Sequence, residues 1–328
     1  MESLKNKLKI TLITTTLLLS LTGTTNATQN QPTENNPTIV ATSTNLGSFA
    51  EEIAGENIQI TTIAPAGACP GHYDTRPGDV EAISQADLII WGGFEPWLED
   101  LVQNSGNTNV MKNKTPTGAW GPPPRAKIYV ENIENALSAA FPQYEEIFEE
   151  KKENFLDRIN STAGDLQVRA EENNIENVEV ICQVFQKPYV EWLGFNVVET
   201  FPSPEKVSAS KTSELVETAE KENVTLIISN NASGTGYGEQ IAAETGLEHV
   251  VLGNFPGWTK GVDTYIDLIE SNAERLILGV KTHRNEQGEI SDLEQDIDNI
   301  EIQRNAALTI ALIAGLVAII EFAMIRRG

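Results

Sequence analysis

Short apolar runs alternate with amphipathic segments along most of the chain. The runs at residues 38–43, 58–65 and 86–93 are rich in β-branched side chains and end in turn residues, which is typical of buried strands. Between them, residues 46–56 and 77–85 carry apolar positions at helical spacing. This alternation predicts a parallel sheet with helices on both faces.

The same alternation returns in the second half of the chain. Strands are predicted at 178–185, 195–201, 224–231 and 248–254, with helical segments between them. Residues 142–173 separate the two regions and contain few helix breakers, over a length far beyond the roughly 11 residues of an average helix. The predicted fold is therefore α/β, with two lobes that each hold a mostly parallel sheet flanked by helices, joined by a long backbone helix.

The N-terminal segment has the layout of a secretory signal. Three lysines, Lys5, Lys7 and Lys9, precede an apolar run, and small residues follow at Thr25 and Ala27. The run covers only about 12 residues, whereas a membrane span needs roughly 20. We therefore expect cleavage near Ala27.

The C-terminal segment is predicted to cross a membrane. Residues 306–325 are apolar over about the length of a bilayer core, and Arg326 and Arg327 follow at once, which places the last residues inside the cell. The acidic segment before the span carries apolar residues at spacings of three and four, typical of an amphipathic or coiled stalk, although a solvated tether fits nearly as well. The predicted organisation is a signal segment (1–27), a disordered spacer (28–37), an N-terminal α/β lobe (38–121), linking helices (122–173), a C-terminal α/β lobe (174–284), an acidic stalk (285–305) and a transmembrane helix (306–325).

The net negative charge of the chain argues against nucleic acid as a partner. The chain has 47 acidic and 23 basic residues, for a formal net charge of −24. Such a surface repels nucleic acid and offers no basic patch to bind it. The predicted location is the outer face of the cell membrane, with the main body extracytoplasmic and a single C-terminal anchor.

Several stretches together resemble the periplasmic metal-binding proteins of ABC importers for zinc and manganese, whose two lobes are joined by a rigid long helix. Residues 46–101 are similar to the family's first lobe, in which a histidine in a loop precedes a Tyr, an Arg-Pro pair and an acidic helix start. Residues 94–101 resemble its Glu-x-Trp-Leu element, 141–159 its Pro-initiated backbone helix, and 261–276 its closing helix. The resemblance implies an extracytoplasmic binding protein, not an enzyme, that works with an ABC permease and its ATPase.

The ligand positions implied by the resemblance are only partly kept. The first-lobe histidine falls on His72, but Gly118 stands where a second histidine usually precedes a Trp. The third position falls on Cys182 or Gln183, and Gly253 and Asn254 stand near the position of the usual acidic ligand.

The chemistry of the remaining residues suits a soft metal. Cys69, three residues before His72, and Cys182 from the other lobe would add thiolates to the imidazole, a set suited to Zn, Ni or Cu(I). Zinc prefers four ligands, and Tyr73, Gln183, Asn254 or water would complete the site. Because the body is expected outside the cell, a Cys69–Cys182 disulfide is an equally good alternative. The candidate metal ligands are His72, Cys69, Cys182 and Gln183.

The transported ligand is expected to be zinc or another transition metal, as an ion or as a metal complex. A cleft lined by aromatic residues such as Trp91, Trp120 and Trp258 would suit a ligand larger than a bare ion, for example a metal chelate or corrinoid. Two alternatives remain: an exported thiol enzyme with Cys69 as nucleophile and His72 as base, and a non-transport surface protein.

Overall fold

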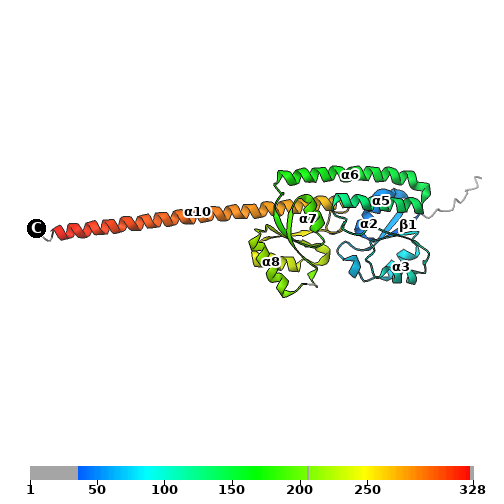
Figure 1. Ribbon diagram of the computed structural model, residues 1–328, viewed down its shortest axis with the longest axis horizontal. Helices are drawn as coiled ribbons and strands as arrows, with labels where there is room; N and C mark the ends of the chain where they lie inside the picture. Colours follow the sequence, from blue (N-terminus) through cyan, green and yellow to red (C-terminus); the bar gives the residue numbers. More distant parts are fainter. Residues whose placement is uncertain (1–35, 205–206, 326–328) are drawn as a thin grey trace, which may run out of the picture. The chain divides into compact units, whose positions relative to one another are not determined.

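The computed structural model describes residues 36–204 and 207–325 (Figure 1). Residues from Pro37 onward belong to one compact unit, and the description below concerns that unit. The predicted signal segment and nearly all of the predicted spacer lie outside the described residues.

The first lobe contains a four-stranded parallel sheet in the order β2-β1-β3-β4. Ile39, Val40 and Ala41 of the central strand β1 are completely buried, as expected for a strand covered on both faces. The elements are β1 (Thr38–Ser43), α2 (Thr44–Ala54), β2 (Gln59–Ala64), α3 (Pro77–Ser84), β3 (Leu88–Trp91), α4 (Leu98–Ser105) and β4 (Met111–Lys114).

The second lobe repeats the arrangement with the order β6-β5-β7-β8, again all parallel. The prediction of two lobes with parallel sheets flanked by helices is confirmed. Its elements are β5 (Glu179–Gln183), α7 (Lys187–Leu193), β6 (Asn196–Phe201), α8 (Ala209–Lys221), β7 (Leu226–Asn230), α9 (Gly236–Thr245) and β8 (Glu248–Leu252).

The edge strand β4 (Met111–Lys114) does not appear among the predicted strands. Its sequence, MKNK, is polar, and three of its four side chains are exposed. The strand exists because its backbone pairs with β3 from Leu88 to Trp91, and an edge strand needs no apolar alternation to do so. The hydrophobic periodicity of the sequence therefore could not predict this strand.

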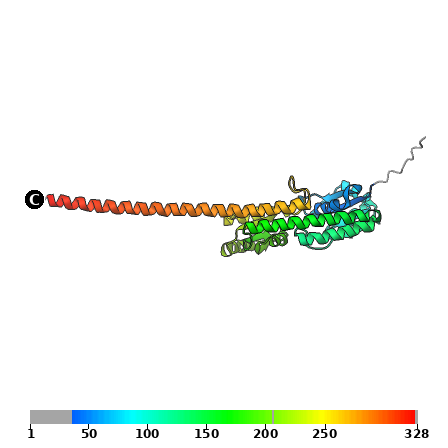
Figure 2. The same ribbon diagram turned by 90° about the horizontal axis from the view of Figure 1, so that it is seen from above.

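Two linking helices connect the lobes: α5 (Pro123–Ala140) and α6 (Glu145–Glu172). Figures 1 and 2 show α6 running alongside both lobes. Phe148, Phe155 and Ile159 on α6 are buried, as are Leu166 and Ala170 nearer its C-terminal end, and all five belong to one core cluster that includes strand residues of both sheets. The lobes therefore share a continuous apolar core along α6.

The last helix, α10 (Tyr265–Ile325), is continuous over 61 residues. Its first part packs on β8, and residues 284–310 are all exposed, so the predicted acidic stalk is helical. Among residues whose side chains are described, no helix is both long and apolar enough to cross a membrane. Most side chains of residues 306–325 lie outside the described set, and the transmembrane helix remains a prediction.

A matched pair of glycines tests the packing of α10 against the second sheet. A Cβ at Gly279 would lie 2.6 Å from Val250 Cγ2 and 3.1 Å from Leu226 Cδ2, whereas one at Gly164, an exposed position of α6, would meet nothing within 4 Å. Overpacking costs about 1–3 kcal/mol, and the helical gain of alanine, about 0.5–1 kcal/mol, offsets only part of it. Thermal unfolding should show a lower Tm for Gly279→Ala and a slightly higher one for Gly164→Ala. Equal shifts in the same direction would contradict this packing.

Candidate functional site

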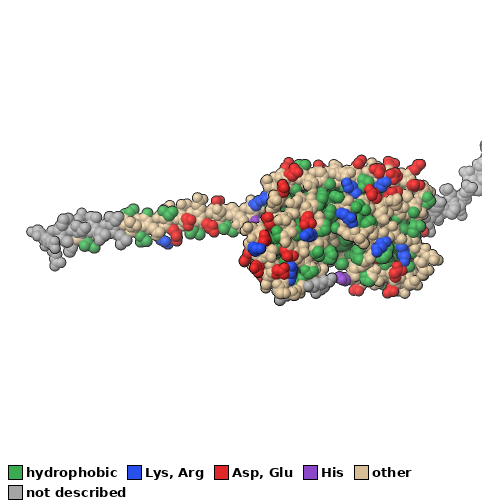
Figure 3. All heavy atoms as spheres, in the orientation of Figure 1, with side chains coloured by type: hydrophobic (Ala, Val, Ile, Leu, Met, Phe, Trp, Pro, Cys, Tyr) green, Lys and Arg blue, Asp and Glu red, His purple; other side chains and the backbone are tan. Residues whose placement is uncertain are grey.

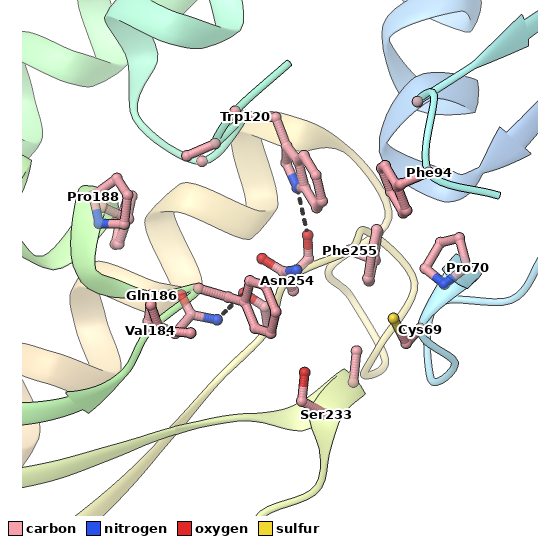
Figure 4. A pocket seen from close by; sticks show the side chains of 18 of the residues that line it. Cys69, Pro70, Phe94, Trp120, Val184, Gln186, Pro188, Ser233, Asn254 and Phe255 are labelled. Atoms are coloured by element: carbon pink, nitrogen blue, oxygen red, sulfur yellow. Dashed lines mark hydrogen bonds between the residues drawn. The ribbon is translucent and has the colours of Figure 1, made fainter. Parts of the chain in front are cut away.

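A cavity of about 840 Å³ lies between the lobes, where the strands of both sheets end (Figure 4). Each of the loops that follow β2 to β8 contributes lining residues, and none of the described lining residues comes from the opposite edges of the sheets. Ligands of open α/β sheets bind at the carboxyl ends of the strands. The volume of the cavity falls within the range of roughly 300–1,000 Å³ that is typical of small-molecule sites.

Cys69 and His72 line this cavity from the first lobe. Cys69 precedes a short 3₁₀ turn, Pro70–His72, and His72 ends it; the His72 N–H donates to Cys69 O at 2.9 Å. The Trp97 indole N–H donates to Pro70 O at 2.7 Å and fixes the turn from outside. Cys69 is half-buried, with its sulfur on the cavity side of the loop near Phe255 (Figure 4). His72 is exposed. The structure thus brings these two predicted residues together.

Cys182 and Gln183 do not line the cavity. Cys182 is completely buried in β5, and burial raises the pKa of its thiol to about 12, so the thiol is neutral at physiological pH. Gln183 is also completely buried, and its Oε1 accepts the Asn230 N–H at 2.7 Å. Both Cys182 and Cys69 are free thiols, so the disulfide considered from the sequence is not formed in this structure.

The described residues contain no group of three or more His, Cys, Asp or Glu side chains that could hold a metal ion. Of the further ligands considered, Tyr73 donates its hydroxyl to Asp79 at 3.0 Å and is not a lining residue, whereas Asn254 lines the cavity. Gly118 and Gly253 line it too, and they offer no side-chain donor. Cys69 and His72 are therefore the soft donors that the described lining offers.

Three aromatic rings form a wall of the cavity: Phe94, Trp120 and Phe255. Trp120 stacks on Phe94 with ring centroids 6.4 Å apart and planes 9° from parallel, and its centroid lies 5.3 Å from that of Phe255. The Trp120 indole N–H donates to Asn254 O at 2.8 Å, so this wall also joins the lobes. We call these three residues the aromatic wall.

Of the tryptophans considered from the sequence, only Trp120 lines the cavity. Trp91 packs in the first-lobe core beneath the Lys114 ammonium group, and Trp258 lies under the Arg275 guanidinium group. The Trp258 indole also lies directly behind Gly253 of the lining. Both rings therefore pack within the protein and are not themselves lining residues.

A buried carboxylate holds the loop that carries Phe94. Glu95 is 4% exposed and accepts hydrogen bonds from the backbone N–H groups of Gly92 and Phe94, at 3.0 and 2.9 Å, and from the Thr42 hydroxyl. Three donors compensate for the loss of water around the carboxylate. Glu95 thus fixes the conformation of the loop that carries Phe94, the first residue of the aromatic wall.

The opposite side of the cavity is held by α10. The Asn272 side chain accepts the Gly253 N–H and donates to Gly253 O, both at 2.9 Å. The Tyr265 hydroxyl donates to Gly121 O at 2.9 Å, across the lobe boundary. The last helix of the chain therefore fixes lining loops from both lobes.

The described lining contains no Asp, Glu, Lys or Arg side chain. It exposes large apolar groups instead: Phe94 is 46% exposed, Val184 43% and Phe185 51%. Figure 3 shows hydrophobic side chains gathered where the lobes meet, with acidic side chains spread over the outer surface. The cavity is therefore neutral and apolar in a chain of net charge −24.

Sequence reasoning missed most of these lining residues. Phe94 lies in GGFEP, directly after the predicted strand 86–93, and Phe185 lies in QVFQKP, at the end of the predicted strand 178–185 and in the turn that follows β5 in the structure. An apolar residue in a solvent-facing loop at a strand's carboxyl end is the signal that would have indicated them.

The two cysteines should differ in reactivity. In the folded chain at pH 8, iodoacetamide should modify Cys69, whereas Cys182, with a pKa of about 12 and no access, should react only after denaturation. Mass spectrometry of Cys69→Ala and Cys182→Ala variants assigns each site. Equal native labelling of the two thiols would contradict the placement of Cys182 in the core.

Comparison with known proteins agrees with this architecture. The family model described as zinc-uptake complex component A, periplasmic, matches residues 39–278. The chain is 24% identical over 281 residues to the iron-binding protein YfeA of Yersinia pestis, covering 75% of this chain and 89% of that protein. It is 26% identical over 278 residues to the manganese-binding lipoprotein MntA of Halalkalibacterium halodurans, covering 74% and 88% respectively.

Solved structures show the same fold. A crystal structure of ZnuA matches with a TM-score of 0.65 at 18% identity, covering 75% of this chain and 99% of that one. A Mn-bound periplasmic metal-binding protein from Candidatus Liberibacter asiaticus matches with a TM-score of 0.62 at 20% identity, covering 74% and 99%. Because the family model covers most of the chain, the chain belongs to the family of the zinc-uptake complex component A, periplasmic.

Proposed function

We propose that the chain is the extracytoplasmic substrate-binding component of an ABC importer and takes up a transition metal, as an ion or as a complex, in the cavity between its lobes. The observation that carries this proposal is the cavity itself, built from strand ends of both lobes with Cys69 and His72 in its lining. The relatives are named for binding iron and manganese, and the family for uptake of zinc.

Thiolate and imidazole favour zinc and other borderline or soft metals over manganese, which prefers carboxylate and water oxygens. The described lining contains no carboxylate. We therefore place manganese below zinc, cobalt, nickel and copper(I) as substrate.

We further propose that residues 306–325 anchor the chain at the outer face of the membrane, with Arg326 and Arg327 on the cytoplasmic side. The apolar length and the following positive charges support this orientation. A tethered binding protein stays close to the ABC permease and ATPase, which raises its effective concentration there.

Equilibrium dialysis with elemental analysis tests the binding function. The purified full chain, kept reduced in detergent, should retain about one metal per chain when dialysed against a transition metal supplied free or as a complex. A Cys69→Ala, His72→Ala double variant should retain much less, because the soft donors of the cavity are gone. Retention of no metal in any form by the unmodified chain would contradict the function.

Deletion of residues 306–328 tests the anchor. The full chain should sediment with membranes after a high-salt wash, whereas the deleted chain should be soluble, because about 20 apolar residues are lost. A chain in which a polyleucine segment of equal length replaces 306–325 should return to the membrane. A deleted chain that still sediments would contradict the anchor.

A further inference from the structure

We infer that the substrate is a flat, uncharged or weakly charged organic chelate of a soft transition metal, whose metal binds the Cys69 thiolate while its organic face lies against the aromatic wall. This inference rests on the proposed function and names the substrate class of the same cavity. Four properties of the cavity support it: donor number, charge, apolar exposure and volume.

The donor number is too small for a bare ion. Zinc takes four ligands in closed sites, and even catalytic sites supply three from the protein. The described lining offers Cys69 and His72 as metal donors of that kind, and no cluster of three metal-binding side chains exists among the described residues. The remaining coordination positions must arrive with the metal, and a chelator fills them.

The charge of the lining leads to the same conclusion. A dication in a cavity with one thiolate would remain net positive among groups that carry no formal charge, and transfer of an uncompensated charge from water is costly. A chelate spreads the charge over a larger molecule or cancels it with its own anionic donors. The Cys69 thiol releases its proton to solvent when its sulfur binds the metal, and no electron transfer is involved.

The apolar surfaces indicate the shape of the ligand. Phe94 and Trp120 are stacked with planes 9° from parallel, and Phe94 is 46% exposed. Val184 and Phe185 present apolar surface from the second lobe. Covering such surface contributes about 25 cal/mol per Å², which an ion cannot provide and a flat organic molecule can. The 840 Å³ cavity is large enough for such a ligand.

Polar groups of the lining supply orientation. Gln186, Ser233 and Asn254 line the cavity from the second lobe, whereas Cys69 lines it from the first (Figure 4). Few polar groups in a mostly apolar site are typical of small-molecule recognition. A chelate with polar edges would place them toward the second lobe and its metal toward Cys69.

The 1:1 complex of cobalt(II) with pyridine-2,6-dicarboxylate is a suitable probe, because the chelator is flat and aromatic, its two carboxylates cancel the charge of the metal, and coordination positions stay open on the metal. The full chain in detergent is titrated with this complex, with Co²⁺ alone and with pyridine-2,6-dicarboxylate alone, against empty micelles as the blank. The complex should bind at least tenfold more tightly than either component and show a thiolate-to-cobalt charge-transfer band.

Two pairs of variants separate the contributions. Cys69→Ser should abolish the charge-transfer band, whereas Cys182→Ala should keep it, since Cys182 lies in the core. Phe94→Ala should weaken binding about tenfold, because the ligand loses apolar contact. Met111→Ala, which removes an apolar side chain of nearly equal exposure, 45%, outside the cavity, should change nothing.

Each contrary result has a definite meaning. If Co²⁺ alone binds as tightly as the complex, the inference that the substrate is a chelate is contradicted, while the proposed function stands. If pyridine-2,6-dicarboxylate alone binds as tightly, the role of the metal and of Cys69 is contradicted. If no probe binds, the inference fails, and the dialysis experiment decides separately whether the proposed function fails with it.

Discussion

The structure depends on one continuous apolar core that joins the two lobes along α6. Phe155 packs on Phe49 of the first lobe, and α6 contacts α2 and α5 as well as α7 and α10, so one helix packs on helices that flank both sheets. Bending between the lobes would expose part of this core to water, at a cost proportional to the apolar area. The separation of the facing strand ends, and hence the width of the cavity, is therefore set by packing away from the cavity.

The contacts across the cavity add to this constraint. The Trp120 indole binds Asn254 O, the Tyr265 hydroxyl binds Gly121 O, and the Thr44 hydroxyl binds Pro256 O at 2.7 Å. Each joins a residue of one lobe or linker to a backbone carbonyl of another segment, so each fixes a loop without using a charged group. The Phe94 loop is held by the buried Glu95 carboxylate, which is not a lining residue, and the other walls are held by backbone acceptors and by core packing, so the described lining can remain neutral.

The sequence was sufficient for the architecture and for part of the site. Buried strands such as 38–43 and 226–230 are apolar and β-branched, so their pattern predicts them, whereas β4 is a polar edge strand that its pattern does not reveal. His72 was predicted because the family resemblance places a ligand there and because ligands of open α/β sheets bind in loops at strand ends, and Cys69 was predicted because it lies three residues earlier in the same loop. The structure places both residues in the cavity lining. The sequence could not predict the exposure of each cysteine, because exposure depends on the direction in which the side chain points at the end of a strand.

The aromatic wall was largely beyond sequence reasoning for a similar reason. Phe94 and Phe255 are more than 150 residues apart and meet only through Trp120. Phe255 is almost fully buried and reads in sequence as an ordinary loop aromatic. The wall arises from packing between residues far apart in the sequence. It makes the cavity apolar, unlike a site built of several metal ligands.

The central claim is that the cavity holds a metal together with an organic molecule. Native mass spectrometry of the full chain, isolated from its own membranes in a mild detergent, tests this most directly. The account predicts a bound mass equal to one transition metal plus an organic ligand, released as a single species on activation and missing from the Cys69→Ala variant. A bound mass equal to a metal ion alone would contradict it.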